Sequence, residues 1–501
     1  MKQKAIRSGL LLAIAVFLLP VLAACGKTPS TTETPTSGSV ADSATEPADT
    51  ALTDNLPDLQ MDGFKLNILS YTDAAHGYSL KTMAPVEEPS DDVGQKIYSR
   101  NMKIEDRFDC LIYENQQDRP YDIMRNSAAA QLATCDVAMI YEEHINRILV
   151  NNPTGLSPFS AIPYLDLERP WWNQDASDVY SMNGFQYAGI GDWCLSMYSK
   201  VYCYFLNKDV YRSVEQEKSI YDIVRDQEWT LETMYAITEQ YTQELDGEDG
   251  WTAGDRYGVV GTCKVHYQLL LTGCGLKFVD KDEEGKYEFS FRGVEADNRI
   301  SRILELNGTD SYYDNTPGEF NGSIKSDEFV ADHALLLAAT ITNLGGVKEA
   351  KGGNVGVLPA PKWDSLQENY CSVAIGGLLT CFPSNIPADR LEYTGILVEA
   401  LCCDSYNELV PYYQEVLLKS QRSESPEDSE MMDILFNNLT YDLGCSTWAN
   451  DIRLPIIKEI FLPRQSEYTS ALKLLAAKST TAIAQTTEAI ENILSSMAGE
   501  E

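Results

Sequence analysis

The sequence has few histidines and lacks the short motifs that mark common catalytic centres. Its 501 residues include four histidines, and none of them belongs to an HExxH zinc motif or follows a triad order. A GxSxG nucleophile turn and a Walker loop are absent as well. A glycoside hydrolase needs only two carboxylates at a set separation, and 75 acidic residues supply many candidates. Nothing in the sequence singles out one such pair, so we expect a protein that is not an enzyme, with a cell-surface glycosidase or a structural surface protein as the alternatives.

Positive charge is also scarce. Lysine and arginine together number 39 against 75 acidic residues, which gives a formal net charge of −36. Nucleic acid is therefore not an expected partner, because binding the phosphate backbone requires many lysines and arginines. The same excess of negative charge disfavours polyanionic ligands and anionic lipid surfaces. A neutral or cationic ligand fits this composition better.

Cysteine motifs with metal-binding spacing are lacking. The chain has 12 cysteines, but no CxxC pair or Cys/His cluster has the spacing of a zinc site. Most of them, such as Cys110 and Cys381, lie in apolar runs, where free cysteine behaves as a small hydrophobic residue. Either some of them form disulfides, as in most exported proteins, or the host lives without oxygen, and we favour the second. No metal or cofactor is expected.

No stretch is apolar over the roughly 20 residues that a membrane-spanning helix requires. At the N-terminus, three basic residues precede a shorter apolar run at residues 10–19, which predicts a secretory signal peptide over residues 1–24. Leu-Ala-Ala-Cys-Gly at residues 22–26 resembles the lipobox of bacterial lipoproteins. The resemblance implies a diacylglycerol on Cys25, and hence a protein held by lipid on the extracellular face of the cell membrane.

The segment from the lipidated cysteine to residue 60 predicts a disordered tether. It is rich in Thr, Ser, Pro, Ala and acidic residues, and it contains no Phe, Tyr or Trp. Such a composition cannot bury enough apolar surface to offset the entropy lost on ordering. We therefore expect residues 25–60 to have no role in folding.

The remaining chain alternates between strand and helix patterns. Residues 64–68 and 110–113 read as strands, and between them Val93, Ile97 and Ile104 fall on one face of a helix. Thr230 is expected to cap a helix that begins at Leu231. Strands that alternate with helices predict an α/β protein with mostly parallel pairing.

Five segments, in order, resemble the extracellular solute-binding proteins of ABC importers, in the group that contains maltose-type sugar binders. They are Tyr204–Tyr211 (like YNKDLF), Glu228–Glu232 (like TWEEL), Asp255–Gly258, Gly356–Lys362 (like GVLPYPK) and Ala374–Gly377. No single segment is specific, and their shared order carries the resemblance. It covers most of the chain from about Phe64 onward.

The resemblance implies a periplasmic-binding-protein fold of the second type, with two α/β lobes joined by a hinge and a cleft between them. Residues 61–203 with about 345–400 are expected to form one lobe, and residues 204–344 with about 401–501 the other. The implied function is capture of a solute, most often a carbohydrate or oligosaccharide, for delivery to ABC transporter permease subunits. A monomer is expected.

Ligand-binding candidates are aromatic rings and polar groups at the ends of strands. Rings stack on the apolar faces of sugars, and carboxylates bind the hydroxyls, although core packing is the alternative for every ring. Trp193 is favoured because it follows the glycine-rich turn Gly189–Asp192. The full set of candidates is Tyr71, Asp73, Tyr141, Glu142, Trp172, Trp193, Gly376 and Trp448.

One loop is strongly acidic. Residues 244–250 read Glu-Leu-Asp-Gly-Glu-Asp-Gly, and alternating carboxylates of this kind are calcium ligands in other proteins. An extra acidic residue before the last glycine breaks the D-x-D-x-D-G spacing. A solvated acidic turn is the favoured interpretation, and calcium is the alternative.

Overall fold

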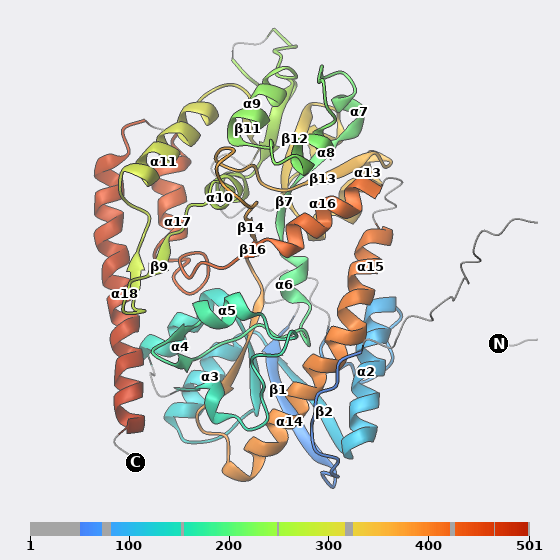
Figure 1. Cartoon of the computed structure of the whole chain (residues 1–501), viewed down its shortest axis with the longest axis vertical. Coiled ribbons are helices and arrows are strands. Elements are labelled where there is room, and N and C mark those ends of the chain that lie inside the picture. Colours follow the sequence, from blue (N-terminus) through green and yellow to red (C-terminus); the bar gives the residue numbers. More distant parts are fainter. Residues whose placement is uncertain are drawn as a thin grey trace, which may run out of the picture. The chain divides into compact units, whose positions relative to one another are not determined.

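The structure is a computed structural model of the whole chain, shown in Figure 1. It describes residues 51–498 except 73–81, 152–154, 248–249, 316–323, 421–425 and 465. The expected signal peptide, Cys25 and the candidate Asp73 lie outside the described residues. The chain divides into the units Met1–Thr50 and Ala51–Glu501, and all elements named below belong to the second unit.

The first of two five-stranded sheets has the order β2-β1-β3-β15-β4. Strand β1 pairs in parallel with β2 and β3, whereas β15 runs antiparallel to β3. The chain passes from β1 to its parallel neighbour β2 through helix α2, which confirms the β-α-β unit that the sequence predicts. We call this sheet and its helices the first lobe. Its elements are β1 (Phe64–Tyr71), α2 (Asp92–Phe108), β2 (Cys110–Gln117), α3 (Pro120–Ala129), β3 (Val137–Tyr141), α4 (Ile145–Asn151), β4 (Leu156–Ser157), β15 (Leu378–Pro383) and α14 (Ala388–Asp404).

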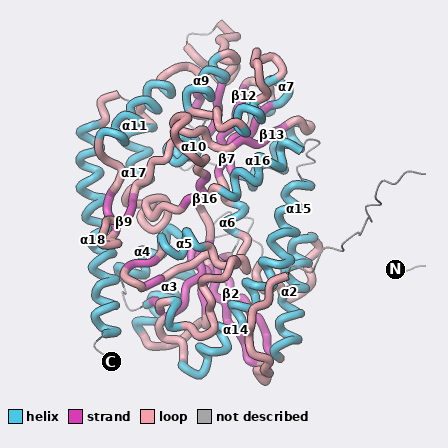
Figure 2. Tube along the Cα trace, viewed as in Figure 1, coloured by secondary structure: helices cyan, strands magenta, loops and turns pink. Residues whose placement is uncertain are grey.

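The second sheet has the order β11-β8-β12-β7-β13 and forms the core of the second lobe. Strand β7 runs antiparallel to both of its neighbours, while β8, β11 and β12 are mutually parallel. Figure 2 shows the strands gathered in two groups, each flanked by helices. The elements of this lobe include β7 (Tyr202–Asn207), α9 (Leu231–Glu239), β8 (Tyr257–Gly261), α10 (Cys263–Gly273), α11 (Val294–Asn307), β11 (Tyr312–Asp314), β12 (Ala334–Thr340), α13 (Leu344–Lys351), β13 (Val355–Leu358) and α16 (Pro426–Asn437).

Helix starts in both lobes follow from local capping chemistry. The Asp91 side chain accepts a hydrogen bond from the backbone N–H of Gly94 and caps α2. The Thr230 side chain accepts from the N–H of Thr233 at the start of α9, which confirms the predicted cap. Each cap satisfies a donor that the first helical turn leaves unpaired.

Three stretches of chain join the lobes. One leads from α6 (Ser196–Ser199) into β7, and a second, Ala374–Gly377, leads back into β15. The third is α14, which continues through a π-helical turn, η5 (Ser405–Leu409), into α15 (Val410–Ser420), and α16 of the second lobe comes next in the sequence. Several connections of this kind restrict relative movement of two lobes to hinge-like modes.

The division of the chain between the lobes differs from the expected one at β13. This strand pairs antiparallel with β7, with Val357 opposite Phe205, so it belongs to the second sheet. The expected return at about residue 345 placed it in the first lobe. The return comes instead at Ala374–Gly377, because an apolar strand pattern does not reveal which sheet supplies its partner.

Helix α18 (Thr469–Ala498) packs against α4 of the first lobe and against β10 (Tyr287–Phe289), the partner of β9 (Val279–Lys281). Among the residues that the structure describes, no helix combines the length and apolar character needed to cross a bilayer. All eleven cysteines in this part of the chain carry free thiols, and all except Cys371 are buried.

The last part of the expected tether is ordered against the first lobe. We call residues 51–59 the strap. The backbone of Leu52 is hydrogen-bonded to the side chain of Asn407, and Asp54 forms an ion pair with Arg107. Leu56 is half-buried against the hydrophobic core. The expectation that residues up to 60 take no part in the fold is therefore wrong for the strap, because composition alone overlooked its leucines and its specific polar partners.

Removing the strap is expected to destabilise the protein. A chain that begins at Gln60 loses the two-bond Asp54–Arg107 ion pair and the burial of Leu56, about 1 kcal/mol each. Its free energy of unfolding in denaturant should fall by roughly 2 kcal/mol, whereas a chain beginning at Ala51 should match one beginning at Gly26. Equal stability of all three chains would show that the strap does not pack as described.

Candidate functional site

The carboxyl ends of the parallel strands in the first sheet point toward the stretches that join the lobes. In open α/β sheets, ligands bind outside these strand ends. A small cavity of about 70 Å³ lies at this edge. Its lining residues come from β1, the segment before α2, α2, β2, the turn before α6, α6 (Ser196–Ser199), β15 and α15: Ser70, Tyr71, Met83, Ile97, Glu114, Gln116, Trp193, Cys194, Leu195, Ser196, Ser199, Leu378 and Tyr413.

Two polar groups of the β1 and β2 ends are already paired within the protein. The carboxylate of Glu114 accepts hydrogen bonds from the hydroxyl of Ser70 at 2.5 Å and the backbone N–H of Met83 at 2.7 Å. The hydroxyl of Tyr71 lies 2.8 Å from Nδ1 of His144. Tyr71, a predicted ligand residue, therefore reaches the cavity with its hydroxyl held by a histidine.

Trp193 combines a place in the cavity wall with a packed environment. Its exposed fraction is 2%, and its indole Nε1 donates a hydrogen bond to Oγ1 of Thr380 at 2.9 Å. The turn before it requires glycine, since a Cβ on Gly191 would lie 2.7 Å from Sγ of Cys402 and 2.9 Å from the ring of Trp172. The glycine-rich turn that singled out Trp193 in the sequence thus allows close packing of its neighbours.

Truncation of Trp193 is expected to cost stability as well as any ligand contact. Trp193→Ala should lower the free energy of unfolding by about 3–5 kcal/mol, because a buried ring is lost. Trp193→Phe keeps a ring and loses the bond to Thr380, for a cost of about 1 kcal/mol. Thermal melts of the two variants check this order, and a parent-like melt for Trp193→Ala would contradict it.

Two buried acids lie near the same strand ends. Burial raises the pKa of Glu142 to about 8, although its carboxylate accepts a hydrogen bond from the N–H of Gly376 at 2.7 Å. Gly376 has φ +101°, a conformation that favours glycine. Burial also raises the pKa of Asp192 to about 7, and the hydroxyl of Tyr198 donates a hydrogen bond of 2.7 Å to its carboxylate. Near neutral pH both acids are therefore able to donate or accept hydrogen bonds, as sugar hydroxyls require.

The raised pKa of Glu142 predicts a pH dependence of stability. The folded protein keeps this proton up to about pH 8, whereas an unfolded chain releases it near pH 4.5. The stabilisation is complete below pH 4.5 and is lost as the pH rises through 8. Between pH 5 and pH 9 the free energy of unfolding should fall by roughly 2–4 kcal/mol more in the parent than in Glu142→Gln.

Urea unfolding at several pH values measures this difference. Glu168→Gln is the matched control, because Glu168 is exposed. This control should follow the parent at every pH. A Glu142→Gln curve that runs parallel to the parent curve would contradict the raised pKa.

An ion pair beside these acids joins the first lobe to a helical segment that packs against α10 of the second lobe. Nη2 of Arg453, in α17 (Arg453–Ile456), lies 3.0 Å from a carboxylate oxygen of Glu143, which directly follows Glu142. The guanidinium is 2% exposed, and its Nε and Nη1 have no hydrogen-bond partner among the residues that the structure describes. Burial, and then the charge of Arg453, lowers the pKa of Lys264 at the start of α10. Sequence reasoning missed Arg453, Asp192 and Lys264, since nothing in a single sequence shows that Arg453 and Asp192 are buried or that Lys264 lies near Arg453.

Two of the predicted rings lie in packed surroundings outside the cavity lining. The indoles of Trp171 and Trp172 donate hydrogen bonds of 2.8 and 2.9 Å to the two carboxylate oxygens of Glu399 in α14. Trp448 donates to Oγ1 of Thr486 in α18 at 3.0 Å and packs edge-on against Tyr287. Trp172 and Trp448 thus occupy core positions. Of the other candidates, Tyr141 ends β3 at 7% exposure, next to Glu142.

The acidic loop brings three carboxylates together. Ligand atoms of Glu244, Asp246 and Asp255 lie within 4.8 Å of one another. The Asp255 oxygens accept backbone N–H bonds from Thr252 and Leu245 at 2.8 and 2.7 Å, and these bonds lower its pKa. Asp255 thereby closes the turn, while Glu244 and Asp246 are exposed. The preference for a solvated acidic turn, with calcium as its alternative, stays a prediction, and residues 248–249 lie outside the described residues.

Comparisons with known proteins show a likeness in fold. No protein-family model and no curated protein sequence matches the chain. Among solved structures, it resembles a cyclo/maltodextrin-binding protein in complex with maltotetraose, with a TM-score of 0.53, 11% identity, and coverage of 86% of this chain and 97% of that one. It also resembles UspC of M. tuberculosis, with a TM-score of 0.53, 14% identity, and coverage of 84% and 100%.

These likenesses extend over both lobes, because each covers more than four fifths of this chain and nearly all of the other protein. Together with the two sheets and their three connections, they confirm the predicted fold. The chain is an α/β protein with the two-lobed architecture of type II periplasmic binding proteins.

Proposed function

We propose that the protein is the solute-binding lipoprotein of an ABC importer and that its ligand is a carbohydrate. The observation that supports this most is the cavity at the strand ends of the first lobe, where Trp193 and Tyr71 lie close to buried acids in a two-lobed fold. Aromatic surface together with a few oriented polar groups is the usual composition of a small-molecule site.

Binding of an oligosaccharide requires the lobes to move apart first. The cavity of about 70 Å³ is far smaller than the several hundred Å³ that enclose a small ligand. Opening about the three connections separates Glu143 of the first lobe from Arg453 and exposes the carboxyl groups of Glu142 and Asp192. When the lobes close on a sugar, these carboxyl groups form hydrogen bonds with its hydroxyls, and the rings of Tyr71 and Trp193 stack on its apolar faces.

The rest of the proposal concerns where the receptor works. Lipid on Cys25, expected from the motif at residues 22–26, holds it on the extracellular face of the cell membrane as a monomer. There it delivers ligand to the permease subunits of an ABC transporter. Replacement by Cys25→Ser should release the protein from the membrane fraction, and a variant that stays there in high salt would point to another anchor.

The sugar proposal is tested with thermal shift on the mature chain carrying Cys25→Ser. Maltotetraose is the first probe, followed by a panel of neutral oligosaccharides. A sugar present at 100 times its Kd should stabilise the folded state by about 2.7 kcal/mol and raise the melting temperature. If no sugar shifts the melt, the carbohydrate proposal fails. Release of reducing ends from any of these sugars would favour a glycosidase instead.

A further inference from the structure

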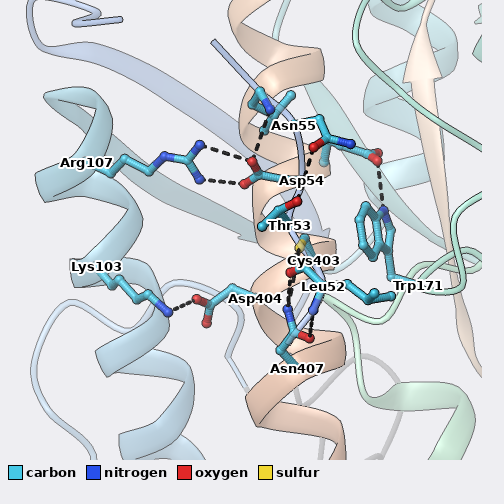
Figure 3. A network of polar contacts seen from close by, with 12 residues as sticks. Leu52, Thr53, Asp54, Asn55, Lys103, Arg107, Trp171, Cys403, Asp404 and Asn407 are labelled. Atoms are coloured by element: carbon cyan, nitrogen blue, oxygen red, sulfur yellow. Dashed lines mark hydrogen bonds and ion pairs between the residues drawn. The ribbon is translucent and has the colours of Figure 1, made fainter. Parts of the chain in front are cut away.

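The strap forms an extensive set of polar contacts with the first lobe, drawn in Figure 3. The backbone N–H of Leu52 donates to Oδ1 of Asn407 at 3.0 Å, and Nδ2 of Asn407 donates to the carbonyl of Leu52 at 2.9 Å. The Cys403 thiol donates to the same carbonyl at 3.4 Å. A side-chain amide that pairs with both backbone groups of one residue fixes the direction of the chain as well as its position.

Thr53 and Asp54, the next two residues of the strap, are also hydrogen-bonded to the first lobe. Asp54 accepts two hydrogen bonds from Arg107 at the end of α2, at 2.5 and 3.1 Å, and Arg169 donates to the carbonyl of Thr53. Burial by itself raises the pKa of Asp54, but the bonds and charge of Arg107 outweigh this, and the pKa lies below its usual value. The strap therefore connects three separate segments of the first lobe: α2, the residues before Trp171, and the end of α14.

Asn407 belongs to the π-helical turn η5, through which α14 continues into α15. Such turns occur mostly as single distortions within α-helices, often at functional sites. Lys103 of α2 pairs with Asp404, the residue before the turn, and with Glu408 within it. The strap thus binds the outer side of the helix where it leaves the first lobe toward α16.

Arg100 binds the same turn from the inner side. Its Nη1 donates to Oγ of Ser405 at 3.0 Å and to the carbonyl of Trp193 at 2.9 Å, while Nη2 reaches the carbonyl of Met83 at 3.3 Å. Burial lowers the pKa of Arg100 to about 10, and its other bonds go to the side chain of Asn101. A buried guanidinium hydrogen-bonded to carbonyls, a hydroxyl and an amide is costly. Here it joins the π-turn to two residues of the cavity wall.

We propose that the strap is a positioning element of the candidate site. It is hydrogen-bonded to the outer side of the π-turn through Asn407. On the inner side, the hydrogen bonds of Arg100 link that turn to Trp193 and Met83, so the position of the turn sets the position of the cavity wall. Tyr413 of α15 lines the same cavity four residues after Leu409, the last residue of the turn. The role at the cavity rests on the proposed function, whereas the binding of the strap to the π-turn can be measured without a ligand.

The test compares two asparagine variants of the full mature chain. Asn407→Ala removes both bonds to Leu52. Asn385→Ala is the matched control, since its side chain also donates within the first lobe, to the carbonyl of Ser127 at 3.1 Å, but lies outside the network. Amide hydrogen exchange of Asn407→Ala should be at least about tenfold faster over residues 51–59, at the π-turn amides 405–410 and at Cys194. The control should match the parent at all of these amides.

Exchange at the π-turn and Cys194 that is unchanged in Asn407→Ala would overturn the proposal, as would coil-like exchange of residues 51–59 in the parent. If Asn407→Ala fails to fold, Asn407→Asp keeps the acceptor for Leu52 and loses the donor, and it should show the same pattern to a smaller extent. Maltotetraose affinity gives a separate readout. Absence of binding by the parent counts against the carbohydrate proposal alone, whereas unweakened binding by Asn407→Ala counts against positioning of the site.

Discussion

The antiparallel pairing of β15 with β3 is the interaction on which the candidate site depends. This pairing returns the chain to the first sheet after all five strands of the second sheet in sequence order, and it places Leu378 opposite Tyr141. Through this register Thr380 meets the indole of Trp193, and Gly376 reaches the carboxylate of Glu142. A slip by one residue would turn Thr380 to the other face of the sheet and remove its bond to Trp193. The cavity wall is thus assembled from segments almost 190 residues apart in sequence.

Local features of the fold were readable from the sequence because they arise from local chemistry. The Thr230 cap and the β-α-β unit around α2 depend on residues a few positions apart, and both are present. The sheet that receives β13 and the docking of the strap depend on distant partners. Val357 pairs with Phe205 and Leu52 with Asn407, and no periodicity in either segment reveals those partners.

The site was foreseeable to a similar extent. Tyr71 ends β1 and Glu142 directly follows β3, as the strand patterns predicted, and the glycine-rich turn led to Trp193 in the cavity wall. That these residues bind a ligand stays a prediction. Trp172 and Trp448 look the same in sequence, but a buried acid and a buried threonine bind their indoles in the core. Asp192 directly precedes Trp193 in the sequence, but its burial and its hydrogen bond with Tyr198 are visible only in the folded chain.

The free thiols add a constraint on how this protein reaches its folded state. All eleven described cysteines are unpaired, and ten of them are shielded from solvent by the completed lobes. A disulfide requires two sulfur atoms to approach within about 2 Å and an oxidant to reach them. After folding, the packing of the lobes prevents both events at the buried positions. The interval between synthesis and folding is therefore the period in which the buried thiols are open to oxidation, and rapid folding shortens it.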